Sequence, residues 1–180
     1  MTVRPWPLLK DEELMKTPVF TLTRQTCRSP KDGGDKVFTV LDVPDWVQVL
    51  ALTDDGQAVL VSQYRIGSRE VSLELPGGVV EAGQTPLEAA QRELREETGY
   101  QAVAWRQMAA FRPNPAVQNN TAHFFVAEGA RLAGPTDFDE NEDLELSLVP
   151  LNSLKEMINK GQIDHAIMVA AILSYFNSTR

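Results

Sequence analysis

Residues 78–100, GVVEAGQTPLEAAQRELREETGY, decide the fold because they specify one helix together with both of its ends. Thr85 is a good N-cap, Pro86 is preorganised for the first helical position, and Glu88 completes a capping box with Thr85. Gly99 is the expected stop, since glycine readily adopts the left-handed conformation that ends a helix. The sequence therefore predicts a helix that begins just after Thr85 and ends at Gly99.

Three acidic residues gather on one side of this predicted helix, beside the edge of its apolar stripe: Glu93, Glu96 and Glu97. At 3.6 residues per turn the stripe expected to be buried is Leu87, Ala90 and Leu94. Like charges three or four residues apart repel by about 0.2–0.5 kcal/mol, so such a cluster needs a compensating partner. Arg92 and Arg95 are one choice, on a solvated acidic face. A hard divalent ion such as Mg2+, which favours carboxylates, water and substrate phosphate, is the other.

A glycine-rich stretch, ELPGG at residues 74–78, follows an apolar strand pattern and leads into the helix. Here the chain resembles the Nudix hydrolase family. The family's box is Gly, five residues, Glu, seven residues, Arg-Glu, an aliphatic residue, any residue, Glu-Glu, any residue, Gly and an apolar residue. The matching positions are Gly78, Arg92, Glu93, Leu94, Glu96, Glu97 and Gly99, with Tyr100 a tolerable final residue. Gln84 departs from the pattern, because the family usually has Glu there.

The remaining segments predict an α/β protein. Strands are expected at 19–23, 36–43, 46–53, 57–64, 101–111, 120–128 and 144–149, and helices at 151–159 and 164–176. The strands 46–53 and 57–64 should form a hairpin around the turn Asp54-Asp55-Gly56. The apolar run AIMVAAILSYF in the last helix is too short to cross a membrane and predicts a core helix. Both the elements and the resemblance imply an α/β/α sandwich with a mixed sheet and an N-terminal strand extension.

The first 44 residues exceed a minimal Nudix core, which we expect to occupy residues 45–180. In the ADP-ribose pyrophosphatase branch of the family, such an extension forms extra strands and helps to build a homodimer. The Gln-Tyr-Arg at residues 63–65 is similar to that branch, as is Pro115, sixteen residues beyond Gly99. The tail segments 140–144 and 161–164 are also similar to bacterial members of the branch.

The resemblance implies a role for each of several residues. Metal ions would be held by the Gly77 carbonyl and by Glu93, Glu96 and Glu97, with Glu96 counted also among the catalytic residues. In the acidic loop we prefer Glu140 as the base that accepts a proton from water and Glu142 as a metal or substrate partner, although this loop could equally be a solvated turn. The candidate substrate contacts are Arg65, Glu74, Trp46, Arg112 and Asn119.

Three of these candidates have a plain structural alternative. Trp46 could stack on a base, but a tryptophan that opens a strand is more often part of a core. Residues 112–120, which contain Arg112 and Asn119, stand where the branch usually has a glycine-rich loop, and they read equally well as a turn-rich connection.

Composition limits the class of protein. A chain of 180 residues with 43% apolar content suits one globular domain with a proper core. A single cysteine rules out an internal disulfide framework, and two histidines are too few for a Cys/His zinc pattern. The formal charge of −8 disfavours nucleic acid as a partner. No stretch is long enough to span a membrane, and the first residues lack the pattern of a signal peptide, so we expect a cytoplasmic protein.

The sequence thus predicts a Mg2+-dependent pyrophosphohydrolase of nucleoside diphosphate sugars such as ADP-ribose, with Mn2+ as a substitute metal. Hydrolysis of dinucleoside polyphosphates, nucleoside triphosphates or capped RNA is the alternative within enzymes. A Nudix-fold ligand sensor without catalysis is the alternative outside them, and its usual mark would be loss of the metal glutamates, which are all present here.

Overall fold

The computed structural model of the chain describes residues 3–138 and 143–178. These residues form two compact units. The first contains the chain up to Pro44 together with Arg112–Thr121, and the second contains Asp45–Phe111 and the chain from Ala122 onward. The units are not two consecutive blocks of sequence, and the expected division into domains at residue 44 stays a prediction.

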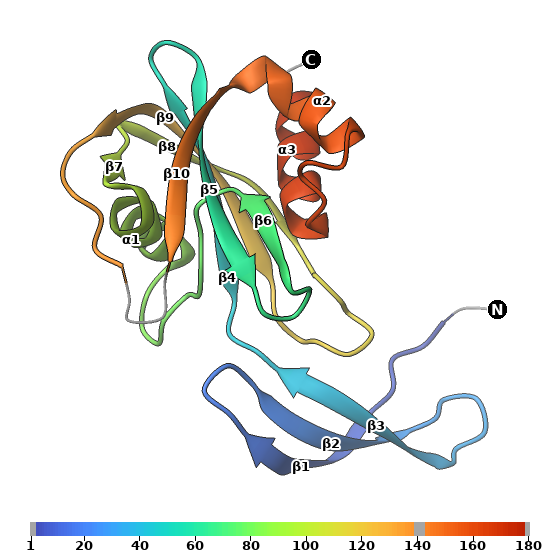
Figure 1. Ribbon diagram of the computed structural model, residues 1–180. Helices are drawn as coiled ribbons and strands as arrows, with labels where there is room; N and C mark the ends of the chain where they lie inside the picture. Colours follow the sequence, from blue (N-terminus) through green and yellow to red (C-terminus); the bar gives the residue numbers. More distant parts are fainter. Residues whose placement is uncertain (1–2, 139–142, 179–180) are drawn as a thin grey trace. The chain divides into compact units, whose positions relative to one another are not determined.

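The first unit contains a three-stranded antiparallel sheet in the order β1-β2-β3 (Figure 1). Its strands are β1 (Leu8–Lys16), β2 (Thr21–Arg28) and β3 (Asp35–Asp42). Strand β3 agrees with the expected strand at 36–43, whereas β2 only overlaps the expected strand at 19–23, since it begins at Thr21 and continues to Arg28. Strand β1 is missed by the sequence analysis, because it is exposed almost throughout and so lacks the apolar/polar alternation of a half-buried strand.

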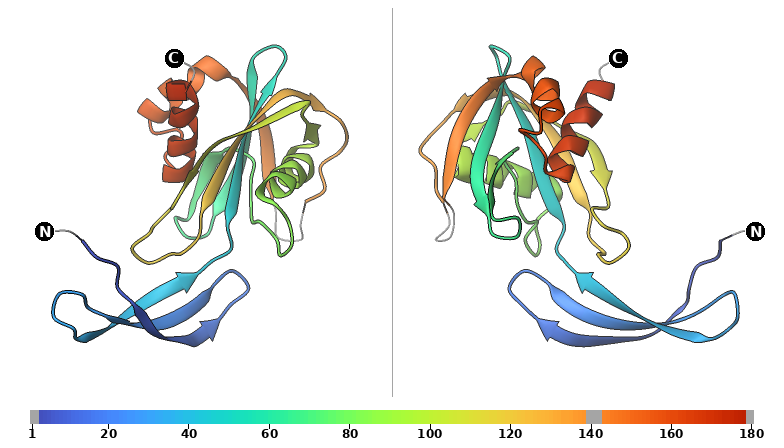
Figure 2. Two further views of the ribbon diagram at one scale, coloured as in Figure 1. Left: turned by 180° about the vertical axis from the view of Figure 1, so that it is seen from behind. Right: turned by 45° about the vertical axis from the view of Figure 1, so that its right-hand side comes forward.

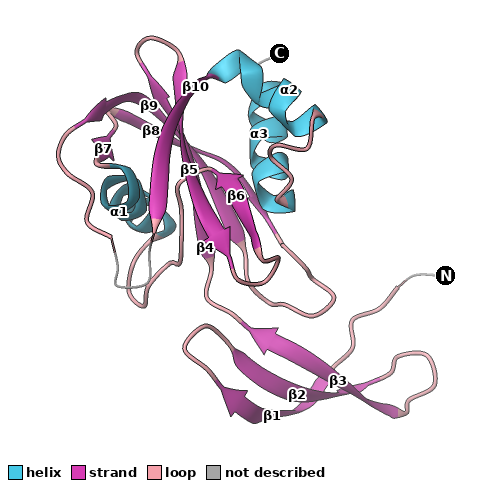
Figure 3. Cartoon of the chain, in the orientation of Figure 1, coloured by secondary structure: helices cyan, strands magenta, loops and turns pink. Residues whose placement is uncertain are grey.

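The second unit is built on a mixed sheet, which contains seven strands among the described residues (Figure 3). Five follow the order β10-β5-β4-β9-β7, while β6 pairs with β5 and β8 pairs with β9. Strands β4 and β9 are parallel and the other pairs are antiparallel. The strands are β4 (Trp46–Thr53), β5 (Gln57–Arg65), β6 (Glu70–Glu74), β7 (Tyr100–Gln101), β8 (Ala104–Phe111), β9 (Ala122–Leu132) and β10 (Leu144–Pro150).

Helices cover both faces of this sheet, as the views in Figures 1 and 2 agree. Helix α1 (Pro86–Thr98) lies on one face, where Ala89, Ala90 and Leu94 pack in one cluster with buried valines of β4 and β5. Helices α2 (Leu154–Asn159) and α3 (Ala166–Ser178) lie on the other, with a short 3-10 turn, η1 (Leu151–Ser153), before α2. Because both faces are buried, β4 is apolar from Val47 to Leu52 except at Gln48, which is itself buried. The predicted α/β sandwich with a mixed sheet is confirmed.

The ends of α1 are those that the sequence predicts. The Thr85 side chain accepts a hydrogen bond from the Glu88 backbone N–H, and the Glu88 side chain accepts one from the Thr85 N–H in return. Gly99 ends the helix with φ of 72°, in the left-handed region. The predicted buried stripe is wrong in one position, because Leu87 is 38% exposed. Ala89, on the neighbouring side of the helix, is fully buried instead.

The C-terminal helices match their predicted positions within a few residues. The apolar run in α3 contributes Met168, Ala171 and Ile172 to the core, as expected for a core helix. In the described part of the chain, no helix is both long and apolar enough to cross a bilayer.

We predict that Gly99→Ala destabilises the protein by about 1–3 kcal/mol, because alanine is strained at positive φ and its Cβ would clash with the Gly134 carbonyl oxygen. Gly134→Ala is the matched control, since its Cβ would meet open space and its φ is not positive. Urea unfolding of the two variants measures the difference. Equal stability of both variants would contradict this account of the helix end.

Candidate active site

The site is organised by the loop that follows β6. Strands β4 and β5 form the predicted hairpin, but they pair only next to its turn, at Ala51 with Val59 and Leu52 with Ala58. Beyond that point β5 pairs with β6, and the loop lies along β4 instead. The N–H groups of Val49 and Val47 donate to the carbonyls of Pro76 and Gly78, each at 2.9 Å, so the loop satisfies the backbone of a buried strand.

Two glycines allow the loop to fit there. A Cβ on Gly77 would clash with the Val47 carbonyl oxygen, and one on Gly78 would clash with the carboxylate of Glu93 on α1. Neither glycine has a positive φ, so the requirement here is space rather than an unusual backbone conformation. The loop thus lies between β4 and the acidic side of α1, with its backbone directly against the carboxylates.

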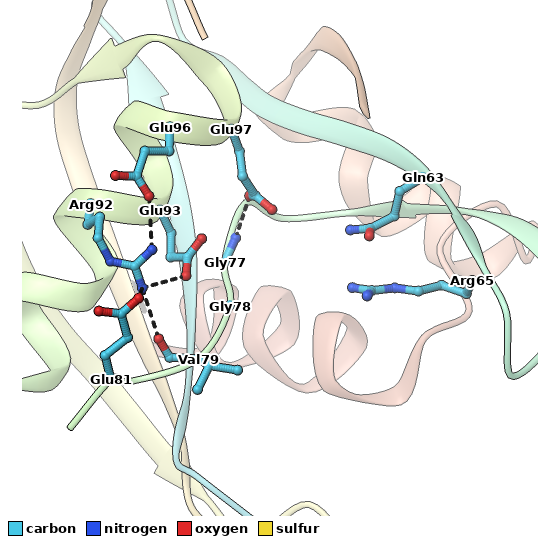
Figure 4. Close-up of a pocket in the computed structure, with 10 residues that line it drawn as sticks. All are labelled: Gln63, Arg65, Gly77, Gly78, Val79, Glu81, Arg92, Glu93, Glu96 and Glu97. Atoms are coloured by element: carbon cyan, nitrogen blue, oxygen red, sulfur yellow. Dashed lines mark hydrogen bonds and ion pairs between the residues drawn. The ribbon is translucent and has the colours of Figure 1, made fainter. Parts of the chain in front are cut away.

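Two of the three clustered acidic residues on α1 are more deeply buried than the sequence analysis expects. Glu93 and Glu97 are only 7% and 4% exposed. Glu97 Oε2 accepts a hydrogen bond of 2.8 Å from the Gly77 backbone N–H, which ties the helix to the loop (Figure 4). Buried carboxylates are costly unless they are paired or hold a cation, so these two residues need compensating positive charge.

Arg92 supplies part of that charge. Its guanidinium donates to Glu93 Oε1 at 2.8 Å and to Glu96 Oε2 at 2.9 Å, and also to the Val79 carbonyl at 3.1 Å. Arg95 donates to the other oxygen of Glu96 at 2.9 Å. The arginine partners that the sequence analysis weighs against a metal ion are therefore present in this structure.

The carboxylates face Gln63 and Arg65 of β5 across a polar cavity of about 240 Å3 (Figure 4). Both β5 side chains point into the space in front of Gly77 and Glu97. The cavity is lined by Gln63, Arg65, Gly77, Gly78, Val79, Glu81, Arg92, Glu93, Glu96 and Glu97. It therefore combines an acidic wall from α1 with a guanidinium on the opposite wall.

Arg65 is held by a buried carboxylate. Its Nε and Nη2 donate to the two oxygens of Glu74, at 2.8 and 2.6 Å, and Glu74 is only 1% exposed. Burial raises the pKa of the Glu74 carboxyl, but the hydrogen bonds from Arg65 and the closeness of His165 outweigh it and lower the pKa to about 2. Glu74 is thus ionised at neutral pH. It does not line the cavity itself, but it holds the Arg65 side chain that does.

The acidic wall fits a divalent metal ion in its donor chemistry. One cavity is lined by Gly77, Glu93, Glu96 and Glu97. Carboxylate and carbonyl oxygens are the ligands that Mg2+ prefers. In the described residues no three acidic, histidine or cysteine side chains are already arranged to hold an ion. Arg92 lies between Glu93 and Glu96 and bonds to one oxygen of each, so its guanidinium would share these carboxylates with an ion bound there.

Of the other predicted site residues, Trp46 does not line this cavity, and the rest lie in the first compact unit or outside the described residues. Trp46 is half-buried and packs against the core cluster on the side of α3. Arg112 and Asn119 belong to the first compact unit. There Asn119 accepts a hydrogen bond from the Val43 N–H and donates one to Asp42. Glu140 and Glu142 lie outside the described residues.

Some residues of the site escape the sequence analysis. Gln63 lies two residues before Arg65 on the same face of β5, and this spacing is the sequence signal that places it in the cavity. Val79 and Glu81 also line the cavity. His165, near Glu74, carried no local signal because its partner lies far away in sequence.

A cavity with carboxylates on one wall and a fixed arginine on the other suits a negatively charged ligand that binds together with cations.

A family profile described as NUDIX domain matches residues 44–172. The ADP-ribose pyrophosphatase of Bacillus subtilis (strain 168) is 34% identical over 162 residues, which cover 89% of this chain and 87% of that protein. The chain belongs to the Nudix family, as its box predicts.

Two further comparisons agree with this assignment. The ADP-ribose pyrophosphatase of Mycobacterium tuberculosis is 29% identical over 176 residues, which cover 97% of this chain and 84% of that protein. A solved structure described as an ADP compounds hydrolase matches with a TM-score of 0.85 at 20% identity, and the match covers 98% of this chain and 95% of that one. At that identity the structural likeness supports the fold alone.

We predict that Glu74→Gln destabilises the protein by about 2 kcal/mol at neutral pH, because it removes the charge that pairs with Arg65. The folded pKa of Glu74 lies below its usual value of 4.5, so the ionised carboxylate stabilises the fold above about pH 4.5 and this contribution is lost as the pH falls toward 2. The gap in unfolding free energy between variant and wild type should therefore narrow over that range. Urea unfolding at several pH values measures the gap.

Glu156→Gln is the control for that series, because Glu156 forms an exposed pair with Lys160 and should change stability little at any pH. A gap for Glu74→Gln that does not depend on pH would contradict the ionised, buried pair.

Proposed function

We propose that this protein is a Mg2+-dependent pyrophosphohydrolase that cleaves nucleoside diphosphate sugars, ADP-ribose among them, into a nucleoside monophosphate and a sugar phosphate. The observation that carries the proposal is the cavity in which Glu93, Glu96 and Glu97 face Arg65. A diphosphate needs both metal ions and a guanidinium to balance its charge, and both would reach it here. The substrate class is supported by the names of the relatives, which are ADP-ribose pyrophosphatases.

The metal would be held by Glu93, Glu96, Glu97 and the Gly77 carbonyl, with Glu142 as a further candidate ligand. When bound, a divalent ion neutralises phosphate oxygens and makes the phosphorus accessible to water. Mg2+ is the expected ion, because these ligands are oxygens and leave room for water and phosphate, and Mn2+ could substitute for it.

The chain's own residues would bind and orient the substrate. Arg65 presents its guanidinium to the diphosphate from a position fixed by Glu74. The Gly77 N–H orients the carboxylate of Glu97, so that this side chain is directed before any ligand arrives. Glu140 is the proposed base, which takes one proton from the attacking water, with Glu96 as a further catalytic candidate. The new P–O bond forms as the P–O bond to the bridging oxygen breaks.

Trp46, Arg112 and Asn119 remain proposed substrate contacts. The packing of Trp46 against the core favours its structural alternative in this unit. Glu74 would act on the substrate through Arg65, since it is almost fully buried.

Assembly and location complete the proposal. The β1–β3 sheet exposes several large apolar side chains, namely Leu8, Leu9, Leu14, Met15, Val37 and Phe38. An exposed strand edge beside such a surface is a liability that pairing with a second copy removes, so we propose that residues 1–44 support a homodimer. The proposed location is the cytoplasm.

The acidic wall of the cavity leads to a prediction about Glu97. Glu97→Gln should lower kcat by at least about 100-fold, because it removes one carboxylate from the metal site, while its amide oxygen can still accept the Gly77 N–H and preserve the fold. Kinetics in excess Mg2+ and a thermal unfolding curve measure both effects. Turnover near that of wild type would count decisively against this site, and the surface variant Glu156→Gln serves as the control.

The substrate assignment is tested by comparing ADP-ribose with a diadenosine polyphosphate. The longer phosphate chain needs more cationic contacts, and the described cavity offers only Arg65 and the already paired Arg92. We expect kcat/KM for the best sugar nucleotide to exceed that for any dinucleoside polyphosphate at least about tenfold, or about 1.4 kcal/mol in transition-state stabilisation. Chromatography should find AMP and ribose 5-phosphate as products. Fastest release of a nucleoside triphosphate from a tetraphosphate would overturn the assignment.

A further inference from the structure

Arg65 borders a second cavity besides the active-site cavity. This second cavity has a volume of about 430 Å3 and lies between the β5–β6 hairpin and the start of α3. Its lining includes Ser68, Ser72, Glu74, Asp164 and His165. The Arg65–Glu74 pair therefore has the active site on one side and the first residues of a core helix on the other.

Glu74 holds one edge of the Arg65 guanidinium. Nε and Nη2 of Arg65 both donate to Glu74, in a bidentate arrangement that sets the plane of the group. The Arg65 side chain as a whole is 44% exposed, so the direction in which it meets a ligand depends on how firmly Glu74 is held. A buried carboxylate can accept more than two hydrogen bonds, and Arg65 supplies two.

His165 stands next to the open side of Glu74. Its backbone carbonyl accepts from the Val169 N–H at 3.0 Å, so His165 is the residue from which α3 starts. Its Nδ1 lies 3.7 Å from Glu74 Oε2 and is itself buried with no hydrogen-bond partner among the described residues. An unsatisfied buried nitrogen costs about 1–3 kcal/mol, and a small rotation of either side chain would form the missing bond.

The first turn of α3 already contacts the chain beside Glu74. The Leu75 backbone N–H lies 3.4 Å from the sulfur of Met168, one turn along the helix from His165. Met168 is fully buried in the core. The helix is therefore a rigid base from which a side chain can hold Glu74 in place.

We propose that His165 is a positioning residue, whose Nδ1–H donates to Glu74 and so fixes the Arg65 guanidinium in the direction from which it meets the substrate diphosphate. This inference rests on the proposed function, in which Arg65 binds that diphosphate. His165 does not touch the substrate, so its loss should weaken binding more than it slows the chemical step.

The test compares variants that keep or remove the donor. In His165→Asn the amide nitrogen stands close to the position of Nδ1, whereas His165→Leu has no donor. His165→Leu should raise KM for ADP-ribose about fivefold to tenfold with kcat within about twofold of wild type, and His165→Asn should stay within about twofold in both. Asp164→Asn, in the same cavity, is the matched control and should behave as wild type.

A second measurement does not depend on activity. The Nε–H of Arg65, identified by its absence in Arg65→Lys, gives a nitrogen-proton resonance whose exchange with water reports the strength of the bond to Glu74. We expect this exchange to be faster in His165→Leu and unchanged in His165→Asn. His165→Gln, which carries its amide one methylene farther out, replaces the leucine variant if thermal unfolding shows that the latter does not fold.

The outcomes are distinct. Unchanged exchange in the donor-free variant, or an equal rise of KM in the asparagine and leucine variants, overturns the positioning role, because packing alone would then explain His165. A fall of kcat at constant KM also overturns it. A wild-type protein that cleaves no sugar nucleotide would instead reject the proposed function, and the exchange measurement would still decide whether His165 holds Arg65.

Discussion

The active site depends on one steric constraint, which is the fit of the Gly77-Gly78 loop between β4 and α1. The loop takes the place of a neighbouring strand beside β4, and its carbonyls accept the N–H groups of Val47 and Val49. No side chain can be added at either glycine without a clash. Because the loop lies this close, the Gly77 N–H reaches the carboxylate of Glu97, and the acidic residues of α1 line the cavity rather than open solvent.

Because the loop is so close, carboxylates at the active-site cavity are buried from water. An arginine pairs with a carboxylate at each of two opposite walls of the cavity. Arg92 bonds to Glu93 and Glu96 within α1, and Arg65 bonds to Glu74 across β5 and β6. The first pairing uses the carboxylates that a metal ion would need, whereas the second uses a carboxylate outside the cavity. The partners of Arg92 therefore line the active-site cavity themselves, whereas Arg65 is held by a residue that does not.

The parts of the fold that depend on neighbouring residues were predictable from the sequence, and the parts that depend on distant partners were not. The caps of α1 follow from Thr85, Glu88 and Gly99, which act within a few residues of one another. Strand β1 was missed, because it has no buried face and therefore no alternation of apolar and polar residues. His165 meets Glu74 only because α3 packs against the sheet, and such a contact leaves no pattern along the chain.

The anchoring of Arg65 matters because its surroundings are acidic. The hydrogen bond to Glu74, together with the charges of Glu74 and Glu97, raises the pKa of the Arg65 guanidinium, so this group stays positively charged at neutral pH. A flexible arginine in this cavity would be drawn to the carboxylates opposite and would compete with metal for them. Glu74 prevents this by binding the guanidinium at two atoms from within the β5–β6 wall. The same pair therefore keeps the Arg65 guanidinium charged and apart from the carboxylates of α1, which explains why a carboxylate is buried at this position.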